Sequence, residues 1–371
     1  MPELEPLRRV AILRALRLGD LLCSVPALRA LRRAWPHAEI TLIGRPWAAW
    51  FVRRFSYLLD RFLALPGWPG VTEEFDPGAA PGFLVEAQGR RFDLVVQMHG
   101  SGLASNPLAL LLGARRTAGY FLPGQPRPDP ELAVPYPGHG PEVLRHLELA
   151  AALGAPAGGT HLEIPVLPGD HERLTAALGG ERLDAYVVLH PGAADPARRW
   201  SPEGFAAVGD RLGPDLRVVI TGTDDERGVA RAVAEAMDAP ALDLSGRTDL
   251  DALVALVAGA RLVVANDTGV SHLADALGVP SVVVFTASDP ARWAPLDREL
   301  HPVAVGPTIE RNPCRHLEGE HRCLRDACRI GQRRLTEIAR DAVDPALVVE
   351  LARRALAQRS SRRRALPDPV G

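Results

Sequence analysis

One stretch of the sequence decides the fold: Arg261-Leu-Val-Val-Ala-Asn-Asp-Thr-Gly-Val-Ser-His-Leu-Ala-Asp-Ala-Leu-Gly-Val-Pro-Ser-Val-Val-Val-Phe285. Its two apolar runs, 262–265 and 281–285, are rich in β-branched residues and predict buried strands. Between them lie a polar turn, 266–269, and a segment with helical spacing, 270–277, so the stretch is one βαβ unit. Continuously apolar strands are typical of parallel sheets covered on both faces, whose ligands bind at the carboxyl ends of the strands. The turn at 266–269 is therefore a candidate site.

The residue types in this turn suit an anionic ligand. Gly269 lets the backbone approach a ligand closely, and the free N–H groups of a helical first turn attract an anion such as a phosphate. Asp267 and Thr268 are also good helix-capping residues. Two interpretations stay open at this point: a phosphate-binding turn, or an ordinary capped helix in an α/β crossover.

Strands and helices alternate along the whole chain, which predicts the α/β class with two consecutive Rossmann-like domains. The predicted strands are 10–13, 39–43, 61–65 and 92–98, then 186–189, 217–221, 241–244, 262–265 and 281–285. The predicted helices are 21–34, 103–112 and 142–153, then 202–212, 225–237, 249–258 and 270–277, and the Pro- and Gly-rich segment 123–141 is expected to be a long loop.

We expect an N-terminal domain over 1–160 and a C-terminal domain over 161–343. The amphipathic helix expected over 344–358 follows the second sheet and is expected to pack back on the first domain. The charged, Pro-containing tail 359–371 is expected to be disordered.

Composition narrows the class of protein. The chain has 371 residues, 47% of them hydrophobic, and lacks both an apolar run of the roughly 18 residues that a membrane span requires and an apolar signal segment near Met1. A cytoplasmic location is expected. The formal net charge of −2 gives no argument for nucleic acid, so no nucleic-acid partner is expected.

Basic charge is concentrated near the N-terminus and consists of arginine alone. Residues 1–60 contain ten arginines and five acids, which suits an anionic acceptor or peripheral contact with the inner membrane face, although a solvated helix face explains the same charges. The chain contains no lysine, which excludes Schiff-base chemistry and a P-loop lysine.

Polar groups follow successive predicted strands of the second domain. They are His190-Pro-Gly192 with Arg198, Arg199 and Trp200, then Gly222 to Glu226, then Thr248, and then Asp267 to His272. At the carboxyl ends of parallel strands these groups converge on one ligand. The absence of G-x-G-x-x-G from both first βα turns argues against a nicotinamide dehydrogenase.

At these residues the chain resembles glycosyltransferase family 9, whose best-known members are the ADP-heptose:lipopolysaccharide heptosyltransferases. The motifs are Leu18-Gly-Asp-Leu-Leu22 through Pro26-Ala-Leu28, His190-Pro-Gly192 with Arg199-Trp200, and Asn266-Asp-Thr-Gly269 through Ser271-His272. The resemblance implies a GT-B fold, in which two Rossmann-like domains with mostly parallel sheets face each other. It also implies a glycan or glycolipid acceptor on the first domain, a nucleotide-sugar donor on the second, inversion at the anomeric carbon, and no cofactor or obligatory metal.

The resemblance assigns the diphosphate of the donor to one group of residues. Arg198 matches a phosphate-binding lysine of the family, and Arg199 could exchange roles with it. Thr268 and Gly269, with Asp267, match the phosphate-contacting turn. The family's hydroxyl residues after the strand 186–189 are replaced here by Pro191-Gly192-Ala193, so contacts there become backbone contacts.

The remaining site residues are assigned in the same way. Asp20 matches the catalytic base, which the chemistry needs because a hydroxyl is a poor nucleophile until its proton is removed; as an alternative it only caps the helix from Leu21. Glu226, following Gly222, matches a ribose-binding acid or is an exposed residue serving the helix dipole. Thr248 falls where the family contacts adenine. His272 reaches the phosphates or the sugar, or is a core histidine.

Donor and acceptor identity rest on the family's commonest members, which suggest heptose from ADP-heptose and a lipopolysaccharide acceptor. Two other functions are considered: a nucleotide-sugar 2-epimerase of the same fold, and a degenerate member that only binds nucleotide sugar. Near the C-terminus, Cys314, His316, His321, Cys323 and Cys328 offer zinc ligands at a spacing that fits no C-x-x-C pair, and a metal-free structural role is expected.

Overall fold

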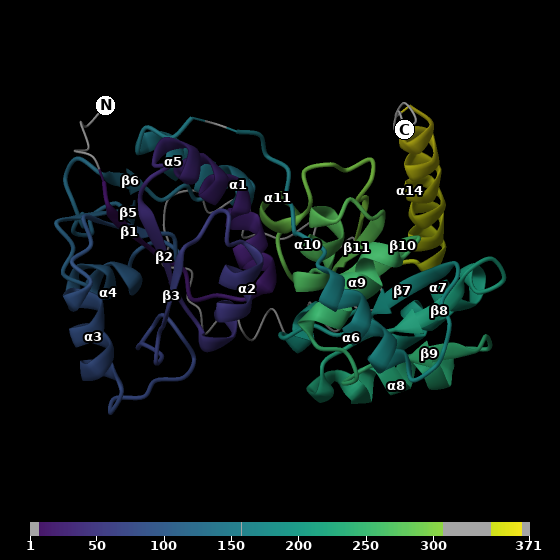
Figure 1. Cartoon of the computed structure of the whole chain (residues 1–371). Coiled ribbons are helices and arrows are strands. Elements are labelled where there is room, and N and C mark those ends of the chain that lie inside the picture. Colours follow the sequence, from purple (N-terminus) through teal and green to yellow (C-terminus); the bar gives the residue numbers. More distant parts are fainter. Residues whose placement is uncertain (1–6, 157, 307–342, 366–371) are drawn as a thin grey trace, which may run out of the picture. The chain divides into compact units, whose positions relative to one another are not determined.

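The computed structural model describes residues 7–156, 158–306 and 343–365, and the chain divides into two compact units, Met1–Pro165 and Val166–Gly371 (Figure 1). The division lies a few residues beyond the expected boundary at 160. Each unit contains one six-stranded sheet in which every strand pair is parallel, as the apolar runs predicted.

The sheet of the first unit has the order β3-β2-β1-β4-β5-β6. Its strands are β1 (Arg9–Leu13), β2 (Glu39–Gly44), β3 (Arg61–Ala64), β4 (Leu94–Gln97), β5 (Arg116–Phe121) and β6 (Ala133–Pro135). In the central strand, Val10 lies opposite Ile40 on one side and Leu94 on the other, and Val10 to Leu13 are fully buried. The sequence did not predict β5 or β6, and β6 lies inside the segment expected to be a long loop.

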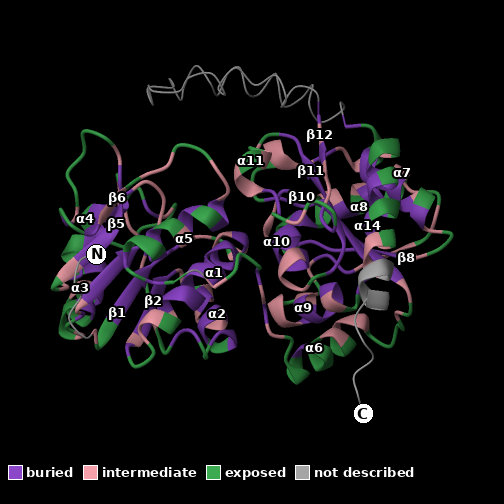
Figure 2. Cartoon of the chain, turned by 90° about the horizontal axis from the view of Figure 1, so that it is seen from above, coloured by how far each residue is buried: buried purple, intermediate pink, exposed green. Residues whose placement is uncertain are grey.

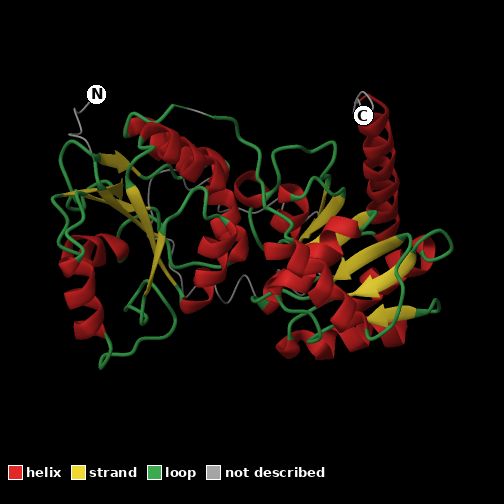
Figure 3. Ribbon diagram, viewed as in Figure 1, coloured by secondary structure: helices red, strands yellow, loops and turns green. Residues whose placement is uncertain are grey.

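Helices surround this sheet, as Figure 3 shows. They are α1 (Leu18–Ala34), the 3-10 helix η1 (Pro46–Ala48), α2 (Ala49–Arg54), α3 (Ala80–Gly89), α4 (Ser105–Leu111) and α5 (Glu142–Ala152). α1 packs against α5, and it begins at Leu18, one turn earlier than its apolar stripe predicted. This early start places Asp20 inside the first turn of the helix.

The second unit has the sheet order β12-β11-β10-β7-β8-β9. Its strands are β7 (Tyr186–His190), β8 (Arg217–Ile220), β9 (Ala241–Asp243), β10 (Leu262–Asn266), β11 (Ser281–Phe285) and β12 (Val303–Val305). Its helices are α6 (Pro168–Leu178), η2 (Pro196–Arg198), α7 (Pro202–Leu212), η3 (Asp224–Glu226), α8 (Arg227–Ala236), α9 (Leu250–Gly259), α10 (Gly269–Ala276), α11 (Pro290–Trp293) and α14 (Pro345–Ala365). All five predicted strands are present, and β7, β10 and β11 are buried along their whole length (Figure 2).

The C-terminal helix α14 corrects two expectations. Its apolar side chains Val348, Leu351, Ala352 and Ala355 belong to the core of the second unit, not to that of the first. α14 packs on β10, β11, β12 and α7, and its apolar side chains are buried there because a sheet and a helix each bury their apolar face against another element. The helix continues to Ala365, through part of the tail that was expected to be disordered.

No helix in the described parts of the chain is long and apolar enough to span a membrane. The cysteines and histidines from Cys314 to Cys328 lie outside the described residues, so the structure does not test their expected role.

Candidate active site

In the second unit, the loops that follow β7 and β10 lie next to each other. β7 comes first in the sequence of this sheet and pairs with β8 on one side and β10 on the other, so the connections diverge between β7 and β10. Ligands of parallel sheets bind at such a switch point, beyond the carboxyl ends of the strands. Residues 191–200 and the start of α10 therefore form the candidate nucleotide site.

Asn266 connects these two loops. Its side-chain oxygen accepts a hydrogen bond of 2.9 Å from the backbone N–H of Trp200, and its amide nitrogen donates to the carbonyl of Pro191 at 2.8 Å. The side chain is fully buried. The sequence predicted that Asn266 opens the turn 266–269, but it is the last residue of β10. This amide fixes the loop that carries Arg198.

Arg198 and Asp267 form an ion pair across the switch point. Nη1 of Arg198 lies 3.3 Å from Oδ2 of Asp267, and the arginine side chain keeps 38% of its surface exposed while the carboxylate is buried. The neighbouring Arg199 donates from Nε to the carbonyl of Ala193 at 2.8 Å and thereby braces its own loop. The structure thus distinguishes the two arginines, and Arg198 is the one that reaches the turn.

The first turn of α10 follows directly. Thr268 occupies the N-cap position in an extended conformation, but its side chain makes no capping hydrogen bond, and Gly269 is the first helical residue. The interpretation of this turn as an ordinary side-chain cap is therefore wrong. His272, one turn into the helix, is buried, and its ring lies 6.4 Å from that of Trp293 in an edge-on arrangement.

Glu226 lies against two glycines of the site. It is only 7% exposed, and its Oε2 accepts a hydrogen bond of 2.8 Å from the backbone N–H of Thr223. The expectation of an exposed glutamate is wrong because the chain folds Glu226 back under Gly192 and Gly222; a Cβ added to Gly192 would lie 2.3 Å from its Cδ. The structure therefore brings together three residues that the sequence placed after two different strands.

His190, the last residue of β7, belongs to the His190-Pro-Gly192 motif, from which no role for it was predicted. Its Nδ1 lies 3.0 Å from Oγ1 of Thr221, and its Nε2 lies 4.0 Å from the Glu226 carboxylate. Burial lowers the pKa of the imidazole, against the opposing effect of Glu226. A neutral histidine is thus packed beneath the carboxylate.

Thr248 lies farther along the same edge, half-buried in the segment between β9 and α9.

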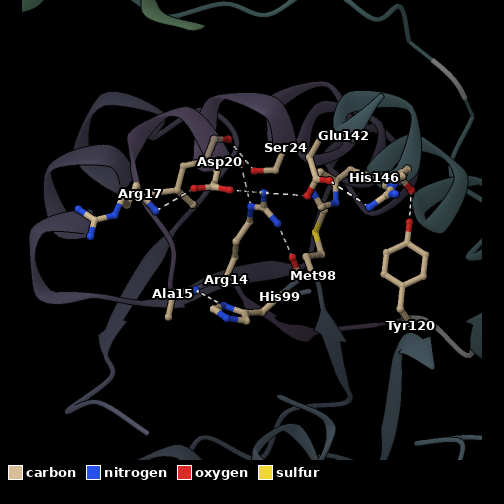
Figure 4. Close-up of polar contacts among 12 residues, drawn as sticks. Arg14, Ala15, Arg17, Asp20, Ser24, Met98, His99, Tyr120, Glu142 and His146 are labelled. Carbon is tan, nitrogen blue, oxygen red and sulfur yellow. Dashed lines mark hydrogen bonds and ion pairs between the residues drawn. The ribbon is translucent and has the colours of Figure 1, made fainter. Parts of the chain in front are cut away.

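The first unit repeats this arrangement around Asp20. Its sheet diverges between β1 and β4, and Asp20 lies in the first turn of the helix after β1. Oδ2 of Asp20 accepts from the backbone N–H of Arg17 at 3.2 Å, Oδ1 faces the guanidinium of Arg14 at 3.9 Å, and the side chain is 20% exposed (Figure 4). Asp20 supports the helix start and still presents its carboxylate at the switch point, so the capping role and the catalytic role are compatible.

Further charged groups surround Asp20 that the sequence analysis did not single out. His99, after β4, accepts from the backbone N–H of Ala15 at 3.2 Å, and burial together with Arg14 lowers its pKa to about 4. Arg17 and Arg45 both lie 3.4 Å from the exposed carboxylate of Glu73. The sequence signal for His99, Arg17 and Arg45 is their position shortly after predicted strands, and Glu73 has no such signal. Among the described residues, no group of three or more metal-ligating side chains is assembled.

The chain is similar to known heptosyltransferases in sequence and in fold. The chain is 31% identical over 300 residues to lipopolysaccharide heptosyltransferase 3 of Escherichia coli, a match covering 76% of this chain and 84% of that protein. It is 34% identical over 121 residues to lipopolysaccharide heptosyltransferase 2 of Escherichia coli K12, where the match spans only 35% of the relative. The solved E. coli ADP-heptose LPS heptosyltransferase II shares the fold, with a TM-score of 0.71 at 20% identity over 95% of this chain and 99% of that one.

These findings confirm the predicted GT-B class of fold and the predicted family. The family model for glycosyltransferase family 9 (heptosyltransferase) matches residues 86–324, which is more than half of the chain. The chain belongs to glycosyltransferase family 9.

Proposed function

We propose that the protein transfers a heptose from ADP-heptose to a hydroxyl group of a lipopolysaccharide-core acceptor, with inversion at the anomeric carbon. The observation that carries the proposal is the pairing of Arg198 with the buried Asp267 at the start of α10, beside the glycine-lined Glu226. The names of the two relatives described above, both lipopolysaccharide heptosyltransferases, support the sugar and the acceptor class.

The donor is assigned to the second unit. The N–H groups at the start of α10, around Thr268 and Gly269, suit the diphosphate, and Arg198 adds a charge that can fork onto phosphate oxygens. Asp267 acts through Arg198, because a carboxylate in direct contact with phosphate would repel it. Glu226 is assigned to the ribose hydroxyls, Thr248 to the adenine, and His272 to the phosphates or the sugar.

In the reaction, Asp20 removes the proton of the acceptor hydroxyl as its oxygen forms a bond to the anomeric carbon. The bond from that carbon to the phosphate oxygen breaks, and its electron pair leaves with ADP. Arg198 and the N-terminus of α10 stabilise the growing negative charge on the diphosphate. Attack opposite to the leaving group inverts the anomeric carbon.

We assign the acceptor to the first unit, around Asp20, where Arg17 and Arg45 provide cationic groups. An acceptor of the lipopolysaccharide core is assembled on a lipid. The proposal therefore includes peripheral contact with the inner face of the cytoplasmic membrane, and liposome co-sedimentation measures this contact directly.

The deciding experiment compares Asp20→Asn with a matched control. Asp170 occupies the same position in the first turn of α6 and accepts the backbone N–H of Leu167 at 2.8 Å, the counterpart of the bond that Asp20 accepts from Arg17. With ADP-heptose and a lipopolysaccharide-core acceptor, Asp20→Asn should lower turnover by on the order of 10²-fold or more, since general-base assistance is lost. Asp170→Asn should affect stability alone.

The unfolding temperatures of the wild type and of both variants test the donor specificity. ADP-heptose should raise the unfolding temperature of the wild type and of both variants, whereas GDP-, UDP- and dTDP-sugars should not, because only a bound ligand stabilises the folded state. Stabilisation by a different nucleotide sugar would overturn the donor assignment. Equal turnover in Asp20→Asn and the wild type would overturn the assignment of the base.

A further inference from the structure

Arg14 is a fully buried cation directly beneath Asp20. It follows β1, its side chain has no exposed surface, and its guanidinium donates from Nε to the backbone carbonyl of Asp20 at 2.9 Å and from Nη1 to the carbonyl of Met98. The first bond ties the arginine to the opening turn of α1, and the second ties it to the end of β4. Figure 4 shows the guanidinium between these elements and α5.

The remaining nitrogen of the guanidinium lies between two carboxylates. Nη2 is 3.9 Å from Oδ1 of Asp20 and 3.6 Å from Oε1 of Glu142, and it has no hydrogen-bond partner among the described residues. A buried donor that lacks a bond is costly, so a small movement that brings the Asp20 carboxylate onto Nη2 is favourable. Hydrogen bonds at catalytic groups are often long in a free enzyme and shorten in the substrate complex.

Glu142, the first residue of α5, holds Arg14 from the other side. This carboxylate is buried, and it also faces Nη1 of Arg145 at 3.5 Å and Nε2 of His146 at 3.3 Å. Burial and the charge of Arg14 lower the pKa of His146 to about 4, so this histidine is neutral at neutral pH. The cluster then contains two arginines, Arg14 and Arg145, and two carboxylates, the buried Glu142 and the partly exposed Asp20.

We propose that Arg14 is the positioning residue of Asp20, and that Glu142 fixes Arg14 and offsets part of its charge. The inference rests on the proposed function, in which Asp20 is the base. Arg14 orients the carboxylate and places a positive charge beside it. Glu142 limits this effect, because a carboxylate beside an uncompensated cation becomes a weaker base.

Other titratable groups face this site and contribute to its electrostatic potential. Arg17 and Arg45 are paired with Glu73 on the loops after β1 and β2, and His99 stands after β4 with its pKa lowered to about 4. None of them lies as deep as Arg14, and the variants below leave all of them unchanged. A shift common to both variants would come from these groups, whereas the proposal predicts shifts in opposite directions.

The test uses the full chain and measures turnover as a function of pH, together with the titration of the Asp20 carboxyl by carbon NMR. In Arg14→Met the acid-side midpoint should move to higher pH, and kcat should fall roughly tenfold or more with little change in KM for the donor. In Glu142→Gln the midpoint should move to lower pH, because the charge of Arg14 is then less compensated. Arg14→Lys keeps the charge and should restore most of the midpoint but not kcat, since an ammonium cannot bond Asp20, Met98 and Glu142 together.

The matched control is Asp129→Asn, which removes a buried carboxylate from an arginine pair elsewhere in the same unit, where Asp129 lies 2.6 Å from Arg116. It should leave the midpoint unchanged. Folded Arg14→Met and Glu142→Gln proteins whose midpoints both equal that of the wild type would overturn the inference. Should Arg14→Met fail to fold, Glu142→Gln and Arg14→Lys carry the test.

Failure of this inference is distinguishable from failure of the proposed function. If Asp20→Asn abolishes turnover but the midpoints of the Arg14 and Glu142 variants do not move, only the positioning role is wrong. If Asp20→Asn retains full turnover, the assignment of the base is wrong, and the NMR titration still reports whether Arg14 and Glu142 act on the carboxyl.

Discussion

At the scale of single residues, the proposed nucleotide site contains close contacts between a carboxylate and two glycines. Glu226 is buried under Gly192 and Gly222, and its position is held by one backbone hydrogen bond from Thr223. Gly192 does not have a positive φ, so an alanine there meets no backbone strain. What excludes a side chain at Gly192 is the space that Glu226 occupies.

We therefore expect Gly192→Ala to weaken ADP binding by about tenfold, which corresponds to about 1.4 kcal/mol. The new methyl group would lie 2.4 Å from Oε2 of Glu226 and must displace the carboxylate. Gly228→Ala, in α8, is the control, because a Cβ there has nothing within 4 Å. Calorimetry on both variants measures the affinity. Unchanged ADP affinity in a folded Gly192→Ala protein would show that Glu226 does not contact the nucleotide.

At the scale of elements, helix N-termini position candidate functional residues, and the C-terminal helix completes the core of the second unit. Asp20 and Thr268 both lie at the start of the helix that follows a central strand. α14 adds Val348, Leu351 and Ala355 to the core formed by β7, β8, β10 and β11. This contribution comes from the end of the chain, far from β7 in sequence.

The contribution of α14 can be measured with two equal truncations on the same helix. Leu351 is 8% exposed and belongs to the core, whereas Leu347 is 39% exposed. Leu351→Ala should lower the free energy of unfolding by about 2 to 4 kcal/mol, because it removes transfer energy and leaves a cavity. Leu347→Ala should cost less than about 1 kcal/mol. Urea unfolding measures both, and equal losses would mean that α14 does not form part of the cooperative core.

At the scale of the whole molecule, two units with separate cores each carry one half of the proposed reaction. In each, the functional residues lie at the point where the sheet order reverses, β1 and β4 in the first unit and β7 and β10 in the second. The titratable groups around these sites are partly buried. Because burial changes their pKa values on folding, the free energy of unfolding depends on pH.

His146 makes this link measurable. Its pKa is lowered from 6.5 to about 4 in the folded state by burial and by Arg14, so between these values the unfolded chain binds the additional proton. The stability contributed by the neutral ring is complete above pH 6.5 and is lost as the pH falls toward 4, by up to about 3 kcal/mol. His146→Gln should reduce the slope of unfolding free energy in this window, whereas His171→Gln, at an exposed position of α6, should not. An unchanged slope in His146→Gln would show that the buried ring is protonated in the folded state.

The sequence by itself determined the α/β class, most strands of both sheets and the family, because apolar runs and helical spacing act over a few residues and the motifs stand at strand ends. It also placed Asp20, Arg198, Asp267 and Thr268 in the segments that directly follow strands. It missed β5, β6 and β12, of which β6 and β12 contain only three residues each, and it placed α14 on the wrong unit, since an amphipathic stripe does not specify which core it covers. Only the tertiary structure decided that Arg198 and not Arg199 meets Asp267, that Asn266 joins two loops, and that Arg14 contacts Met98 and Glu142. These contacts join residues at least 66 positions apart, and they depend on strand order, which local sequence patterns do not encode.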